Sequence, residues 1–176
     1  MKAKYVFITA IAVFASFFFH ELAHWIAGEW LGNKMGMSLN ATYPISGYFV
    51  KDWHENIVSA AGPLFTIAQA FVFYVIINKN GNKNLYPFLL MPFIQRLLAM
   101  GLTFINPNDE ARISQSLELG LLTLPLLVCA TLFVLVYSTS KKYNYSFKFN
   151  AVTIAWMVLF FSILILSDQY FKLRII

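Results

Sequence analysis

The chain has 176 residues, of which 59% are hydrophobic and only 12% are charged, and its formal net charge is +5. Soluble domains carry about 25% charged residues, so this composition excludes an ordinary water-soluble protein and indicates an integral membrane protein. The Lys and Arg residues are spread over short segments without a basic cluster, so nucleic acid is not an implied partner. Cys129 is the only cysteine, which excludes an internal disulfide and a zinc site built from cysteine pairs.

Five apolar stretches approach the roughly 20 residues that a helix needs to cross a bilayer. They cover residues 5–31, 57–77, 86–105, 117–138 and 150–167. Pro87 and Pro92 lie in the third stretch, which we expect to be kinked or broken there because proline cannot donate to the helix ladder. The pattern predicts an all-α membrane protein, a bundle of about five transmembrane helices that forms one integral-membrane domain over residues 1–176 and contacts the lipid bilayer.

The segment from Asn33 to Trp53 differs from the rest of the chain. Glycine and proline stand there among Thr, Tyr, Ile and Val, a mixture that favours extended chain and turns over helix. We expect a small β-hairpin or re-entrant segment between the first and second membrane helices, with a plain connecting loop as the alternative. A strand with a free edge can pair with an extended peptide.

The sequence His20-Glu21-Leu22-Ala23-His24 lies inside the first apolar stretch. Histidines four residues apart project from one face of a helix and can share a metal ion, and the flanking Glu21 can take a proton from metal-bound water. A random match to this pattern is expected in roughly one in seven hundred chains of this composition. Ionisable side chains at bilayer depth cost about 2.5–3.5 kcal/mol each, so we interpret the motif as functional rather than as a histidine pair without metal.

Catalytic zinc usually has three protein ligands and keeps a fourth position for water, so the two histidines need a companion. Asp109 is the favoured candidate, because polar residues around Pro107 interrupt an apolar helix there and a helix break suits a turn that carries a ligand. Glu110 is a rival for the same coordination position.

Five further residues are candidates for the third ligand, and three of them, Asp52, His54 and Glu55, follow the hairpin segment. His54 would complete a site of three histidines. Glu29 is five residues past His24 on the same helix, which turns it about 140° away from the ligand face. Glu118 opens the fourth apolar stretch, where a carboxylate also suits a helix amino end.

Three motifs follow one another along the chain: His20-Glu21-Leu22-Ala23-His24, then Ala61-Gly62-Pro63-Leu64 at the start of the second stretch, then Asn106-Pro107 and Asp109-Glu110-Ala111-Arg112-Ile113 after the third. Over residues 14–114 this order resembles the site-2 protease family of intramembrane zinc metalloproteases. The resemblance implies His20, His24 and Asp109 as zinc ligands, Glu21 as the catalytic carboxylate, and a family-like core over residues 5–116 with additional helices at 117–176.

The chain departs from the family pattern at two places. Thr66 stands near the position of an asparagine that follows the Gly-Pro-Leu element of the family. Glu110 and Ala111 replace paired glycines after the aspartate.

These observations together predict an intramembrane zinc metalloprotease with one Zn²⁺ per chain. Its substrate would be a transmembrane or membrane-bound peptide, Glu21 would activate a zinc-bound water, and Asn106 would hydrogen-bond the substrate or the oxyanion. We expect a multi-pass protein of a bacterial or archaeal cell membrane. The alternative is a metal-binding membrane protein that does not cleave peptides, such as a transporter or a scaffold.

Overall fold

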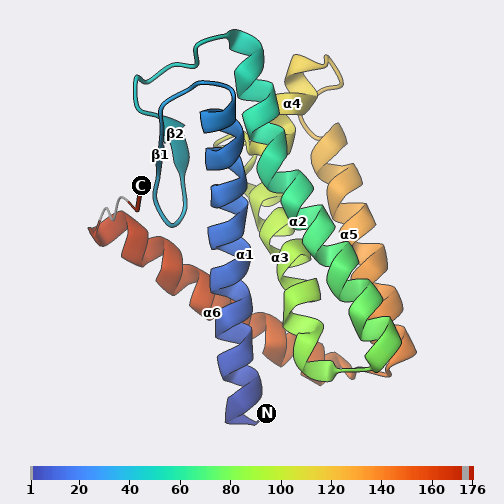
Figure 1. Cartoon of the computed structure of the whole chain (residues 1–176). Helices are drawn as coiled ribbons and strands as arrows, with labels where there is room; N and C mark the ends of the chain where they lie inside the picture. The colour runs from blue at the N-terminus through green and yellow to red at the C-terminus, as the bar shows by residue number, and fades with distance from the viewer. Residues whose placement is uncertain (1, 172–174) are drawn as a thin grey trace.

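The computed structural model describes residues 2–171 and 175–176, which form a helical bundle with one small hairpin (Figure 1). The elements in chain order are α1 (Ala3–Trp30), β1 (Met35–Met37), β2 (Thr42–Pro44), α2 (Asp52–Asn80), the 3₁₀ turn η1 (Lys83–Leu85), α3 (Tyr86–Leu102), α4 (Asp109–Ser116), α5 (Thr123–Lys142) and α6 (Phe147–Phe171). Helix α1 packs against α2, α3 and α6. The hairpin and α4 lie toward the end of the bundle that is opposite the amino terminus.

Helices α1, α2, α5 and α6, together with the η1–α3 segment Lys83–Leu102, are long and apolar enough to cross a membrane. Their lipid-facing surfaces keep large apolar side chains exposed, among them Phe7, Leu64 and Val134. Their inward surfaces form a single apolar core that includes Phe17, Leu90 and Leu132. The predicted all-α, multi-pass membrane protein with five long apolar helices is confirmed.

Helix α4 was not predicted. The membrane helix that follows it begins at Thr123, six residues after the start of the predicted stretch 117–138. Its first turn is capped by Asn108, whose side-chain oxygen accepts a hydrogen bond from the Ala111 N–H at 2.8 Å. After α4 the chain turns through Glu118 and Gly120, both with positive φ. The eight residues of α4 carry polar groups and no long apolar run, so hydropathy alone gave no signal for them.

The expected β-hairpin is confirmed between α1 and α2. Strands β1 and β2 pair antiparallel, with Gly36 opposite Tyr43. A Cβ atom on Gly36 would lie 2.9 Å from the Tyr43 ring, so the glycine lets this ring lie across the strand. The hairpin is tied to α1 because Trp25 Nε1 donates to the Met35 carbonyl (3.2 Å) and Glu29 accepts from the Met35 N–H (2.7 Å).

A second set of contacts ties the hairpin to α6. Asp168 accepts hydrogen bonds from Ser38 Oγ at 2.8 Å and from the Leu39 N–H at 3.1 Å. The Met37 carbonyl also accepts from the Ile175 N–H at 2.8 Å, which adds the chain's last residues to the β1 edge. The hairpin is therefore held from both sides.

Of the kink or break expected at the prolines of α3, the break does not occur, since the helix runs without interruption from Tyr86 to Leu102. Pro87 stands in the first turn, where its missing N–H is harmless. Pro92 lies in the interior and leaves the Phe88 carbonyl without its helical donor. Gln69 of α2 supplies the donor, because its Nε2 lies 3.0 Å from Phe88 O and 2.8 Å from Ser16 Oγ of α1. One side-chain amide thus joins three membrane helices.

This arrangement predicts that Gln69→Met destabilises the protein by about 1–2 kcal/mol, because the Phe88 carbonyl loses its partner. Adding Pro92→Ala should recover much of this loss by restoring the helical N–H. Thermal unfolding of the two single variants and the double variant in detergent measures the coupling. An equal effect of Gln69→Met in both backgrounds would show that Phe88 does not depend on Gln69.

Candidate metal centre

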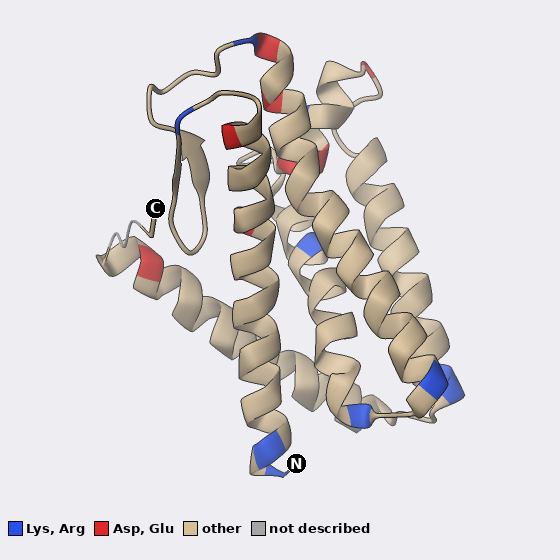
Figure 2. Ribbon diagram, in the orientation of Figure 1, with Lys and Arg blue, Asp and Glu red and all other residues tan. Residues whose placement is uncertain are grey.

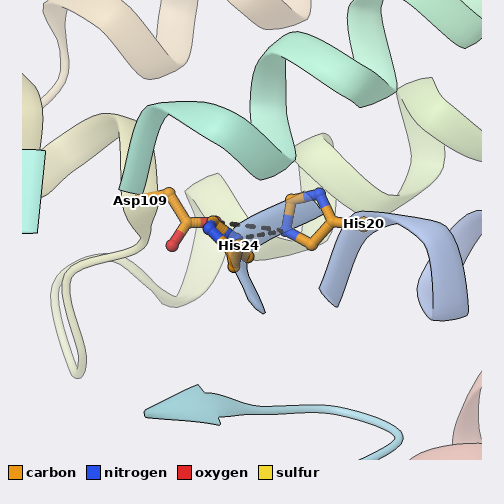
Figure 3. A group of neighbouring side chains, drawn as sticks. All are labelled: His20, His24 and Asp109. Atoms are coloured by element: carbon orange, nitrogen blue, oxygen red, sulfur yellow. Dashed lines mark hydrogen bonds and ion pairs between the residues drawn. The ribbon is translucent and has the colours of Figure 1, made fainter. Parts of the chain in front are cut away.

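His20 and His24 on α1 meet Asp109, the first residue of α4, inside the bundle (Figure 3). The two Nε2 atoms lie 3.1 Å apart, and Asp109 Oδ2 lies 3.2 Å from His20 Nε2 and 3.4 Å from His24 Nε2. Both imidazoles are buried, with 2% and 6% of their residues' surface exposed. These three residues can hold a metal ion.

The spacing of the three ligand atoms matches a tetrahedral zinc site. Zinc bonds to imidazole nitrogen and carboxylate oxygen measure about 2.0–2.2 Å, so adjacent ligands of a tetrahedral ion are about 3.3 Å apart. The three separations in this protein run from 3.1 to 3.4 Å. The side chains therefore stand where a single ion could contact all three.

Hydrogen bonds on the far side of each imidazole indicate which nitrogen carries the proton. His24 Nδ1 lies 2.5 Å from the Val58 carbonyl, which can only accept. His20 Nδ1 lies 2.9 Å from Thr66 Oγ1, and that hydroxyl donates its own proton to the Gly62 carbonyl at 3.0 Å. Both Nδ1 atoms are thus assigned as donors, and both Nε2 atoms present lone pairs to each other.

Two lone pairs and a carboxylate oxygen that face one another repel unless a cation lies between them. The cation can be a proton on one Nε2 or a metal ion. Orientation of metal-binding histidines by hydrogen bonds at the other ring nitrogen is the usual arrangement in metal sites. The donor set and its supporting contacts therefore fit zinc.

Asp109 is held as a carboxylate. Its Oδ1 accepts from Arg112 at 2.7 Å, which leaves Oδ2 to face the imidazoles. Burial would raise the pKa of Asp109, but the hydrogen bonds to His20 and His24, and their charge when an imidazole carries the extra proton, hold that pKa well below its usual value. The group therefore offers a negative ligand at neutral pH.

Glu110, the rival ligand, is engaged elsewhere. Its two carboxylate oxygens lie 3.2 and 3.3 Å from Arg96 NH1 of α3, and both residues are buried. Arg96 also approaches Asp109 Oδ2 at 3.4 Å and His20 Nε2 at 3.5 Å, so it borders the ligand group. Sequence reasoning missed Arg96, although an arginine alone in an apolar stretch was a signal that it serves a buried site.

His54, Glu29 and Glu118 lie outside the ligand group. His54 is buried, and its Nδ1 hydrogen-bonds the Asn33 side chain at 3.1 Å. Glu29 bonds the hairpin backbone at Met35, and Glu118 stands in the exposed turn after α4. None of the three joins His20 and His24 in the metal-binding group found among the described residues.

Gly62 explains how α2 can approach the two imidazoles. A Cβ at this position would lie 2.7 Å from His20 Nε2 and closer still to His24 Nε2. Only a glycine lets the α2 backbone come near enough for Val58 and Thr66 to bond both histidines. The contact of this glycine with both ligands links the Ala61-Gly62-Pro63-Leu64 motif directly to the metal centre.

A cavity of about 530 Å³ opens beside the ligand group. Its wall includes Glu21, Thr42 and Asn106 as well as the apolar side chains of Phe161 and Ile165. The acidic residues of the protein gather toward this end of the bundle, whereas the loops at the amino-terminal end carry Lys (Figure 2). Arg96 and Arg112 also line the cavity, so its wall carries both signs of charge.

Searches against protein-family models, curated proteins and solved structures find no match to this chain. The class of protein is therefore defined by the fold and the site of this chain alone. It is a multi-pass helical membrane protein with a buried His–His–Asp group that can hold a metal ion.

We expect Gly62→Ala to weaken zinc binding by about tenfold or more, because the added methyl group collides with both imidazoles. Competition with a chromogenic chelator measures the affinity. Gly101→Ala is the matched control, since a Cβ there meets no atom within 4 Å. Wild-type affinity in the Gly62 variant would contradict the close approach of α2.

Asp109→Ala should reduce the zinc content from about one ion per chain to near zero after dialysis against a chelator, because one of three ligands is lost. Glu110→Ala should keep the zinc but lower the melting temperature, because it leaves the buried Arg96 charge without its main partner. Metal analysis and thermal unfolding of both variants separate the two roles. Loss of zinc in the Glu110 variant alone would reverse the assignment.

Proposed function

We propose that the protein is an intramembrane zinc metalloprotease of the site-2 protease type, which hydrolyses peptide bonds of membrane-embedded substrates. One observation carries the proposal: Glu21 lines the same cavity as His20, His24 and Asp109, whose nitrogen and oxygen atoms converge. The resemblance of the three successive motifs to that family supports the same conclusion.

The number of ligands favours a catalytic over a structural ion. Structural zinc sites are usually closed by four protein ligands, whereas catalytic sites keep one position for water or substrate. In the described residues the group has three members, and a cavity lies beside it. Water and a peptide carbonyl would therefore both have room at the ion.

A bound zinc ion would lower the pKa of a coordinated water to roughly 7 and polarise the peptide carbonyl. Glu21 would accept the proton of the attacking water and deliver it to the amine nitrogen as the carbon–nitrogen bond breaks. Asn106, on the cavity wall, would donate its amide N–H to the carbonyl oxygen. His20, His24 and Asp109 would keep their present orientations throughout.

The substrate class follows from the surroundings of the cavity. The site lies between helices that can cross a membrane, and Phe161 and Ile165 give one wall an apolar surface. Residues Thr42–Pro44 of β2 also line the cavity, and an extended segment of a substrate could pair with this strand. We infer a locally unwound transmembrane helix or a membrane-bound peptide as substrate.

Purified protein should contain about one zinc ion per chain, and a panel of single-span membrane proteins should include a substrate that it cleaves. Glu21→Gln should lower kcat by at least about a hundredfold while the zinc stays bound, because the proton acceptor is lost and the ligands are not. Undiminished cleavage in this variant would exclude Glu21 as the base.

Stoichiometric zinc without turnover of any substrate would instead favour a transporter or scaffold. Absence of zinc from protein purified without chelators would exclude the metal centre itself.

A further inference from the structure

The Glu21 carboxylate receives a hydrogen bond from the hairpin. Thr42 Oγ1, on β2, lies 2.9 Å from Glu21 Oε2 and 3.0 Å from the Glu21 backbone carbonyl. In the described part of the chain no other residue donates a hydrogen bond to this carboxylate. Glu21 is buried, with 8% of its surface exposed.

We propose that Thr42 is a positioning residue, which aligns the Glu21 carboxylate for proton transfer from water at the metal centre. This inference deepens the proposed function and rests on it. Thr42 does not act on the substrate itself but through Glu21.

The geometry explains why a hydroxyl at this point is effective. A glutamate side chain has three rotatable bonds, and an unrestrained carboxylate samples several rotamers. The Thr42 hydroxyl has a single proton, which is within reach of both Glu21 Oε2 and the Glu21 carbonyl, so the side chain and the main chain of Glu21 share it. This shared contact restrains the carboxylate relative to α1, and it involves only one of the two carboxylate oxygens.

The hairpin makes this contact rigid. Trp25 and Glu29 hold β1 against α1, and Asp168 holds the connecting turn against α6. Thr42 pairs with Met37 in the register of the two strands. A catalytic group held by a partner on a fixed element keeps its productive geometry, and loss of such partners typically costs 10–100-fold in activity.

Substitution by valine and by serine tests the proposal. Thr42→Val keeps the shape of the side chain and removes the hydroxyl, so kcat should fall about ten- to a hundredfold while KM changes less than about threefold and the zinc content stays at about one. Thr42→Ser keeps the hydroxyl and should recover kcat to within a few-fold of wild type. Thr131→Val, the same change on an exposed threonine of α5, is the control and should have no effect.

Wild-type kcat in Thr42→Val would overturn the inference, and so would an equal loss in Thr42→Ser. Loss of zinc together with activity would also overturn it, because Thr42 would then support the fold of the site rather than the alignment of Glu21.

A second measurement needs neither metal nor substrate. In the metal-free protein, Thr42→Val should lower the melting temperature by a few degrees, and by clearly less when Glu21 is already replaced by alanine. Equal losses in both backgrounds would show that the hydroxyl and the carboxylate do not interact. If the wild-type chain cleaves no substrate, the proposed function fails, while this comparison still decides whether Thr42 holds Glu21.

Discussion

The mutual repulsion of three electron-rich atoms is the constraint on which the centre of this protein depends. Two imidazole nitrogens and a carboxylate oxygen face one another at 3.1–3.4 Å in the interior of a helical bundle. Each imidazole donates a hydrogen bond to α2, at the Val58 carbonyl or the Thr66 hydroxyl, and this turns its Nε2 atom inward. A cation between these atoms, either a proton on one Nε2 or a metal ion, would relieve the repulsion, and hydrogen bonds from the imidazoles to α2 fix their orientation.

The charged residues around the three ligands are paired with one another. Helix α4 is too short to cross a membrane, yet it brings Asp109 to the histidines and Glu110 to Arg96 in consecutive positions. Arg112 donates a hydrogen bond to Asp109 Oδ1, and Arg96 lies near Asp109 Oδ2, the oxygen that faces the imidazoles. Buried charges require close partners, and the ion pair of Glu110 with Arg96 joins α4 to α3 beside the ligand group.

Local patterns in the sequence were enough to predict the five long apolar helices, the hairpin and the metal-binding face of α1, because each has a short period or a characteristic composition. Asp109 could be proposed because polar residues interrupt an apolar run. The pairing of Arg96 with Glu110 could not be predicted, since nothing local links α3 to α4. The contact of Thr42 with Glu21 could not be predicted either, because the two residues lie on different elements. Nor could the contact of Gln69 with the Phe88 carbonyl, which replaces the helical donor that Pro92 lacks.

The Gln69 contact has a consequence for the metal centre itself. Ser16 lies one helical turn before His20 on α1, and the amide pins it to α2 and α3 at that level. Rotation or sliding of α1 would break this contact before it moved the imidazoles appreciably. The contact therefore adds to the preorganisation of the ligand face, because a displacement of α1 relative to α2 and α3 would cost these hydrogen bonds.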